Sequence, residues 1–319
     1  MTRFAHARRP LSVVVLTLLV GALALLGAPH AGAAEVERRT YSGATGARDY
    51  YLHVPAGPTA GKPLMIYLHG CTEPERQLAG TGFALTRLAD ELGFVLAYPL
   101  QDRAANERWC WNWYDTAHQR RGDGEAALIA GLTTALAEEF GLDRSRVYVG
   151  GYSAGGGMST VLGAGYPDLY AAIAPMAGGP YAPSTRPMLA DLTGASIVDA
   201  MGERARPMPA LFLQDLADQT SVYPLGRANL AQWLAAGRRA GLPVANTPSA
   251  VTTRTDPVPT TVEHYRVGDC EIARFLTPVG PDHIAGGLMM QSEWGLPMQR
   301  EMMDFLLSHR LAPGHTACG

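Results

Sequence analysis

The sequence predicts an α/β fold, with a mostly parallel central sheet and helices on both faces. Short apolar runs without alternation recur along the chain, which is typical of strands that are buried on both faces. Stretches with a single apolar stripe, typical of helices, separate these runs. No repeat or low-complexity linker interrupts this pattern, so we expect residues 35–319 to form one domain.

The first 34 residues have the layout of a secretory signal peptide. Three arginines precede an apolar run, Leu11–Ala28, and small residues follow it. This order predicts export, with cleavage near Ala33 or Ala34. The alternative is an uncleaved membrane anchor, because the run is nearly long enough to span a bilayer. We expect a secreted, extracellular protein with no stable membrane association after cleavage.

The strands and helices follow from the apolar pattern in chain order. Six apolar segments are predicted strands, the first being the second arm of a hairpin: 48–55, 63–70, 94–99, 146–153, 170–178 and 209–215. Two later segments are also read as strands, 261–269 and 271–279. Predicted helices cover 82–92, 124–140, 225–240 and 298–311, and another begins after Ser153 and ends at Gly165. The segment 246–261 is polar and contains prolines, so it predicts a loop, and 180–209 predicts a loop or a cap.

The charge balance argues against a nucleic-acid partner. Removal of the first 34 residues takes three of the 26 basic residues and none of the 29 acidic ones, which leaves a formal net charge of −6. A mildly acidic chain without a basic cluster is a poor fit to nucleic acid.

The four cysteines predict two disulfides, because an even number in an exported chain is typical of cross-links. Three pairings are possible. Cys71 and Cys110 lie just beyond two predicted strands that can be neighbours, while Cys270 and Cys318 both lie in the last fifty residues. This placement favours the pairs Cys71–Cys110 and Cys270–Cys318. No Cys-x-x-Cys or His-x-x-x-His spacing indicates a metal site.

A serine stands between a predicted strand and a predicted helix. Gly151–Gly155 reads GYSAG and matches the G-x-S-x-G pattern of a nucleophile elbow. Glycines at the flanking positions avoid collisions in so tight a turn, and the helix that follows offers free N–H groups to an oxyanion. We therefore predict Ser153 as a nucleophile and the Ala154 N–H as an oxyanion donor. The alternative is a glycine-rich packing turn.

The base that a serine hydroxyl needs should follow it in the chain. Among the later histidines, His264 lies in a predicted strand, His309 ends a predicted helix, and His315 is close to the C-terminus. His283 instead lies in a predicted loop, beyond a strand and before the last helix. This position predicts His283 as the general base.

The acid that orients this base should follow the strand 209–215. Asp215 and Asp218 both lie there, and Asp218 has the loop position, three residues beyond Asp215. Asp282 is the competitor, but adjacent residues rarely face each other well enough to orient an imidazole. We predict Asp218.

The second oxyanion donor should come from the turn after an earlier strand. The stretch 68–72 reads LHGCT and ends a predicted strand, which predicts the backbone N–H of Cys71 as this donor. His69 is either a core histidine or a brace for this loop, and we assign it no catalytic role.

Three tryptophans alternate at Trp109, Trp111 and Trp113. In an extended segment this period of two would place them on one face. The functional interpretation is an aromatic wall for an aryl or polyester chain, with Trp111 and Trp113 contacting the substrate. The alternative is loop packing fixed by the Cys110 bridge.

The motifs together resemble a known family. HGC is paired with a downstream CWNW, and GYSAGGGM is followed by YPDLYAA. With these motifs, the chain resembles the secreted polyhydroxybutyrate depolymerase family of esterases, which is close to the feruloyl and acetylxylan esterases of the α/β-hydrolase fold. The similarity extends from about Tyr41 to Arg310.

The resemblance implies an ester hydrolase with Ser153 as nucleophile, Asp218 and His283 as its partners, and a disulfide between Cys71 and Cys110. It implies no metal or cofactor, and an ester substrate, which we expect to be a 3-hydroxybutyrate polyester or its oligomers. The alternatives are a feruloyl or acetylxylan esterase on plant polysaccharide, an amide hydrolase, and a non-catalytic binding protein on a hydrolase fold.

The chain departs from the family pattern at two places. Gln214-Asp215 stands where the family usually has His-Gly, and HIAGG stands where it often has His-x-Trp-Pro-Gly. Depolymerases that act on solid polymer usually add a linker and a binding domain, whereas this sequence ends soon after its last predicted helix. We therefore expect soluble esters or oligomers rather than crystalline polymer as substrates.

Overall fold

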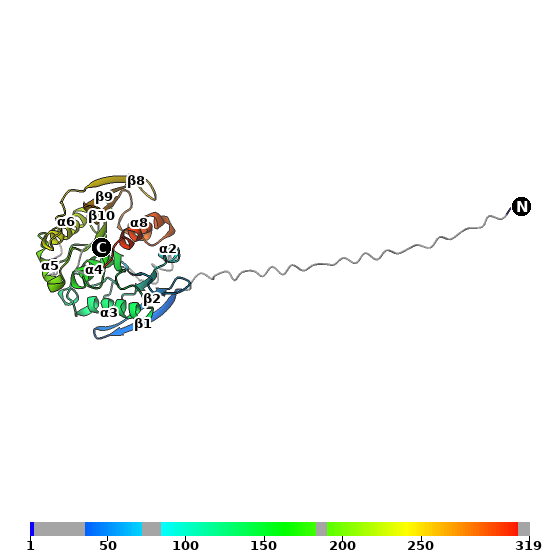
Figure 1. Cartoon of the computed structure of the whole chain (residues 1–319), viewed down its shortest axis with the longest axis horizontal. Coiled ribbons are helices and arrows are strands. Elements are labelled where there is room, and N and C mark those ends of the chain that lie inside the picture. Colours follow the sequence, from blue (N-terminus) through cyan, green and yellow to red (C-terminus); the bar gives the residue numbers. More distant parts are fainter. Residues whose placement is uncertain (3–35, 72–83, 183–189, 312–319) are drawn as a thin grey trace. The chain divides into compact units, whose positions relative to one another are not determined.

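The computed structural model of the protein describes residues 1–2, 36–71, 84–182 and 190–311 (Figure 1). Internal contacts divide the chain between Ala33 and Ala34, and the fold described below is that of the unit Ala34–Gly319. The predicted signal peptide lies almost wholly outside the described residues and stays a prediction. Within the described ranges, no helix is long and apolar enough to cross a membrane.

A ten-stranded sheet forms the centre of this unit, with the strand order β1-β2-β4-β3-β5-β6-β7-β10-β9-β8. The strands from β4 to β10 in that order are parallel, whereas β1, β2, β9 and β8 pair antiparallel at the two ends. The bounds are β1 (Glu37–Gly43), β2 (Gly46–His53), β3 (Leu64–Leu68), β4 (Val95–Pro99), β5 (Val147–Tyr152), β6 (Ala172–Met176), β7 (Ala210–Leu213), β8 (Ala250–Arg254), β9 (Thr260–Val267) and β10 (Cys270–Pro278).

Helices cover both faces of the sheet (Figure 1). On one face lie α3 (Gly124–Glu139), α4 (Ala154–Gly165), α5 (Ala195–Met201) and α6 (Tyr223–Arg239), and on the other lie α2 (Ala84–Leu92), α7 (His283–Met289) and α8 (Leu296–Leu307). Strand β3 shows how the two cores arise. Leu64 and Ile66 enter one core, while Met65 and Tyr67 enter the other, because successive side chains of a strand point to opposite faces.

The predicted α/β fold is confirmed, with a mixed sheet that is mostly parallel. The predicted strands and the helices now labelled α2, α3, α4, α6 and α8 are found at or near their predicted positions. The parallel strands β3, β4, β5, β6 and β7 are buried throughout, which explains why their apolar runs were clear in the sequence.

The loop prediction for 246–261 was wrong, and the segment 180–209, predicted as a loop or a cap, contains a short helix. The segment 246–261 contains β8, which is exposed along most of its length at the edge of the sheet. Such a strand needs no apolar residues, so its sequence resembles a loop. The segment 180–209 contains the short helix α5, of which only Ile197 and Met201 are buried. A helix of two turns with two buried positions gives too few repeats for a period to be recognised.

Parallel strands bring together residues that are far apart in the chain. Strands β5, β7 and β10 end at the same edge of the sheet, and the segments that follow them carry Ser153, Asp218 and His283. In open α/β sheets, ligands bind at this carboxyl edge.

Candidate active site

Ser153 occupies the sharp turn between β5 and α4. Its backbone has φ 57° and ψ −119°, a conformation that a residue with a side chain adopts only under strain. The turn packs closely on the end of β3, since a Cβ added at Gly155 would overlap the carbonyl oxygen of Leu68. Glycine is therefore required two residues after the serine, and the serine side chain is lifted clear of the sheet, which is the geometry of a nucleophile elbow.

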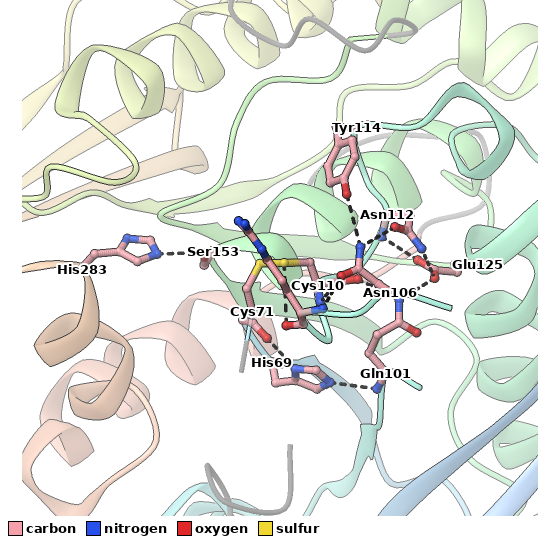
Figure 2. The surroundings of a disulfide bond; sticks show 12 residues. His69, Cys71, Gln101, Asn106, Cys110, Asn112, Tyr114, Glu125, Ser153 and His283 are labelled. Carbon is pink, nitrogen blue, oxygen red and sulfur yellow. Dashed lines mark hydrogen bonds between the residues drawn. A yellow bond between two sulfur atoms is a disulfide. The ribbon is translucent and has the colours of Figure 1, made fainter. Parts of the chain in front are cut away.

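The Ser153 hydroxyl is hydrogen-bonded to His283, and His283 to Asp218. The Ser153 Oγ lies 2.8 Å from His283 Nε2 (Figure 2), and His283 Nδ1 lies 2.6 Å from Asp218 Oδ2. An ionised carboxylate can only accept, so Nδ1 carries the proton and donates to Asp218. The free electron pair of Nε2 then faces the serine hydroxyl, which is the arrangement that general-base activation requires.

The loop after β7 holds Asp218 as a buried carboxylate. Its Oδ1 accepts hydrogen bonds from the backbone N–H groups of Thr220 at 2.8 Å and Ser221 at 2.7 Å. Burial alone would raise the pKa of Asp218, but the hydrogen bond from His283 and these backbone donors lower it below its usual range. Gln214, which stands where the family usually has histidine, donates from Nε2 to Asp218 Oδ2 at 3.3 Å and to the Ser221 carbonyl.

The two competing acids have other partners. Asp215 Oδ1 accepts from the Ala217 N–H at 2.7 Å and so stabilises the turn after β7. Asp282 caps α7, because its Oδ1 accepts from the Ala285 N–H at 2.8 Å.

The loop prediction for His283 was wrong, since His283 is the first residue of α7. The helix was hard to recognise because Gly286 and Gly287 lower its helix propensity.

The end of β3 lies against the serine on the side away from His283 (Figure 2). A Cβ added at Gly70 would be 3.3 Å from the Ser153 Cβ, so Gly70, the residue before Cys71, lies close to the serine. Cys71 is bonded to Cys110 across 39 positions of sequence. Ala154 begins α4, whose first N–H groups have no partner within the helix. That the N–H groups of Cys71 and Ala154 are the two oxyanion donors stays a prediction.

A buried carboxylate anchors the loop that carries Cys110 (Figure 2). Glu125, on the first turn of α3, accepts from the Asn112 N–H at 2.7 Å, the Asn112 Nδ2 at 2.8 Å and the Gln101 Nε2 at 2.5 Å. The Arg48 guanidinium lies 3.5 Å away, and Gln101 also donates to the Cys110 carbonyl at 2.9 Å. Hydrogen bonds thus fix residues before and after Cys110, which the disulfide joins to Cys71.

His69 braces the segment after β3 that leads to Cys71, the predicted oxyanion donor; this side of Ser153 is called the oxyanion side below. Its Nδ1 donates to the Gly70 carbonyl at 2.7 Å, and its Nε2 accepts from the Gln101 N–H at 2.9 Å. Burial lowers the pKa of His69 to about 4, so the ring is neutral at neutral pH, as these two bonds require. Of the two interpretations offered for His69, the structure agrees with the brace.

The tryptophan prediction needs correction. Trp111 is fully buried in the core beside His69, with the two ring centroids 5.4 Å apart, so it cannot line a substrate site. Trp109 has φ 52°, which breaks the extended conformation that one shared face would need. Trp113 is half-buried and lies against the first turns of α4, where a Cβ added at Gly157 would overlap its ring. A substrate contact of Trp113 stays a prediction.

Glu125 and its partners were missed in the sequence. The available signal was an acidic residue on the buried stripe of α3, in register with Leu128, Leu132 and Leu136. A carboxylate on such a stripe must have partners, because an unpaired buried charge is costly.

The second predicted disulfide, Cys270–Cys318, includes Cys318, which lies outside the described residues, and this pairing stays a prediction. In the part of the chain that the structure describes, no group of three or more His, Cys, Asp or Glu residues could hold a metal ion.

Comparisons of the chain with known proteins identify a family. The family model described as "Esterase PHB depolymerase" matches residues 48–230. Poly(3-hydroxyalkanoate) depolymerase C of Paucimonas lemoignei is 40% identical over 131 residues, which cover 41% of this chain and 31% of that protein. Feruloyl esterase B of Neurospora crassa is 34% identical over 131 residues, which cover 40% of this chain and 43% of that protein.

A solved structure shares the fold. The acetyl xylan esterase from Aspergillus awamori superposes with a TM-score of 0.63 at 22% identity, over 82% of this chain and 99% of that one. The sequence matches span less than half of each curated relative named above. The family model, in contrast, covers more than half of the present chain. The chain, with its α/β-hydrolase fold, therefore belongs to the esterase PHB depolymerase family.

Proposed function

We propose that the protein is a secreted serine esterase that hydrolyses carboxylic esters of hydroxyalkanoate oligomers. The observation that carries this proposal is the hydrogen-bonded series Ser153–His283–Asp218 at a strained strand-to-helix turn. A serine, a base and an orienting acid in this arrangement are the requirements for acyl transfer.

In the first half of the reaction, His283 Nε2 takes the proton of Ser153 as Oγ attacks the ester carbonyl. The resulting oxyanion accepts hydrogen bonds from the N–H groups of Cys71 and Ala154. The imidazolium, stabilised by Asp218, then gives its proton to the leaving alcohol, and an acyl-enzyme remains.

In the second half, water replaces the alcohol. His283 takes a proton from this water, whose oxygen attacks the acyl carbon. The second tetrahedral adduct collapses, Ser153 regains its proton from His283, and the carboxylic acid leaves. Atoms balance, because each ester bond consumes one water and yields one acid and one alcohol.

The substrate class rests on the relatives. The 40% identity to a poly(3-hydroxyalkanoate) depolymerase favours hydroxyalkanoate esters. The 34% identity to a feruloyl esterase supports a second candidate, an esterase that acts on aryl or acetyl esters of plant polysaccharide.

The test compares the mature protein with the Ser153→Ala variant on p-nitrophenyl acetate, butyrate and octanoate, on methyl ferulate, and on 3-hydroxybutyrate oligomers. We expect turnover by the wild type and a loss of at least about a thousandfold in the variant. Preference for the oligomers supports the first candidate, and preference for methyl ferulate supports the second. A folded wild type that cleaves none of these esters contradicts the esterase proposal and favours an amide hydrolase or a binding protein.

Export is part of the proposal. It predicts that protein recovered from the culture medium begins at Ala34 or Glu35. An intact N-terminus on membrane-bound protein would contradict it.

A further inference from the structure

The tyrosine that precedes the nucleophile is buried on the side of the sheet that α7 covers. Tyr152 is the last residue of β5 and belongs to the same core as Met289 of α7 and Met298 of α8. Its backbone is paired with Met176 of β6, and Ser153 follows it directly. The ring of Tyr152 therefore starts from a backbone position that is fixed relative to the nucleophile.

Three residues of α7 lie against this ring. The ring centroids of Tyr152 and His283 are 5.3 Å apart, which is a typical distance for aromatic pairs. A Cβ added at Gly286 would lie 2.5 Å from the Tyr152 hydroxyl oxygen, and one added at Gly287 would lie 3.2 Å from Tyr152 Cε1. Residues three and four positions after His283 lie on its side of the helix, so the three residues form one surface toward the ring.

The shape of the Tyr152 ring, rather than its hydroxyl, makes this contact. Among the residues that the structure describes, the hydroxyl has no hydrogen-bond partner. Burial raises the pKa of Tyr152 well above its ordinary value, and the carboxylates of Asp218 and Asp215 raise it further. The side chain thus stays neutral and exchanges no proton with His283.

The position of His283 depends on what packs against α7. This helix has only seven residues, and helices of such length are not stable on their own. His283 must keep Nε2 at 2.8 Å from Ser153 Oγ while Nδ1 stays at 2.6 Å from Asp218. A displacement of about 1 Å at a reacting centre can cost about a hundredfold in rate. A group that ties α7 to the strand of the nucleophile would prevent such a displacement.

We propose that Tyr152 is a positioning residue, which holds His283 at hydrogen-bonding distance from Ser153 by packing its ring against His283, Gly286 and Gly287. The inference rests on the proposed esterase function and deepens it, because it names the residue that sets the distance between base and nucleophile. The two glycines are the counterpart of the ring, since they let the helix approach it.

The first test compares Tyr152→Phe with Tyr152→Leu on p-nitrophenyl butyrate. Phe keeps the ring and removes only an unpartnered hydroxyl, so it should retain at least about a third of the wild-type kcat. Leu takes the ring away from His283, so kcat should fall at least about tenfold while KM stays within about twofold. Urea denaturation shows whether both variants are folded.

The second test does not depend on the folding of the Leu variant. In Gly286→Ala, the added Cβ meets the Tyr152 hydroxyl, so either the ring or the helix must move, and kcat should fall at least about tenfold. Once that hydroxyl is removed, the nearest ring atom is Cζ, 3.4 Å from the Cβ, which is an ordinary contact. The double variant Tyr152→Phe/Gly286→Ala should therefore recover to within about threefold of Tyr152→Phe.

The matched control is Gly237→Ala, another buried glycine inside a helix. A Cβ at this position of α6 would lie 3.7 Å from Val244 Cγ1, which is an ordinary contact. This variant should keep kcat within about twofold, both alone and combined with Tyr152→Phe, because the two sites are independent.

Three results would overturn the inference. They are a folded Tyr152→Leu variant with the wild-type kcat, a Gly286→Ala variant with the wild-type kcat, and a loss in Gly286→Ala that Tyr152→Phe does not restore. The esterase proposal would survive each of them, because wild-type turnover and its dependence on Ser153 are measured in the same experiment. A wild type that hydrolyses no ester would contradict both proposals.

Discussion

The two sides of Ser153 are built in opposite ways. On the side of the predicted oxyanion donors, a disulfide, a buried carboxylate and a neutral histidine bind the ends of β3 and β4 to the start of α3. On the side of His283, the short helix α7 buries Gly286, Gly287 and Met289 and exposes Ile284 and Leu288. Donors to an oxyanion act best when they are already fixed in place, whereas the side that receives the leaving group must stay open to substrate.

The largest effect is expected on the oxyanion side, from Glu125→Ala. This change removes the buried carboxylate that pairs with the Arg48 guanidinium and accepts from the amide groups of Asn112 and Gln101. Loss of one member of a buried charged network costs about 3–5 kcal/mol of unfolding free energy. Urea denaturation measures this loss, and kcat should fall because the Cys110 loop is no longer fixed.

The matched control is Glu139→Ala, at the other end of α3, where the carboxylate is half-exposed and pairs with Arg39. This change should lower the unfolding free energy by less than about 1 kcal/mol. Equal costs at positions 125 and 139 would show that the buried network does not stabilise the oxyanion side.

A somewhat smaller loss of unfolding free energy is expected when the pH is lowered. Burial lowers the pKa of His69 to about 4 from the ordinary 6.5, so between these values the unfolded chain binds a proton that the folded protein does not. The stabilisation is fully present above pH 6.5 and is lost as the pH falls toward 4, by about 3 kcal/mol at most.

The variant His69→Gln keeps an acceptor for Gln101 but does not titrate. Its unfolding free energy should fall less between pH 7 and pH 4.5 than that of wild type, because all other groups titrate alike in both proteins. Parallel curves for the two proteins would exclude His69 as the source of the acid sensitivity.

The smallest effect is expected on the acid–base side, from Asp282→Ala. The change removes the cap of α7 and costs about 1 kcal/mol. Because His283 is the next residue, fraying of this helix should lower kcat severalfold with little change in KM. Asp282→Asn keeps a capping oxygen and should restore most of the activity. If Asn fails to restore it, the role of Asp282 is not that of a cap.

The same contrast explains what could be predicted from the sequence. Residues of the elbow were recognisable because a buried strand, a glycine-flanked serine and a helix follow in order, and the order of the chain then selected Asp218 and His283 for the same site. Helix α7 was not recognisable, since two of its three buried residues are glycines, while Ile284 and Leu288 face solvent. Glu125 was overlooked because partners from distant segments are what make a buried acid tolerable, and a single sequence does not show them.

Trp111 illustrates the same limit through the opposite error, because a core residue was assigned to the site. An aromatic residue next to a predicted site suits both a pocket wall and a core position, and its local pattern is identical in the two cases. Only the packing of the loop on the core and on His69 decides between them.

The sequence separations within the site have a consequence for the folding pathway. His283 lies 130 positions from Ser153 and 65 positions from Asp218, and the three residues follow three different strands of one sheet. Contacts between such distant segments form slowly, because the long intervening loops must close first. During refolding, ester hydrolysis would therefore return only after β5, β7 and β10 have joined the same sheet. The time at which activity recovers would thus report when the last long-range strand pairings form.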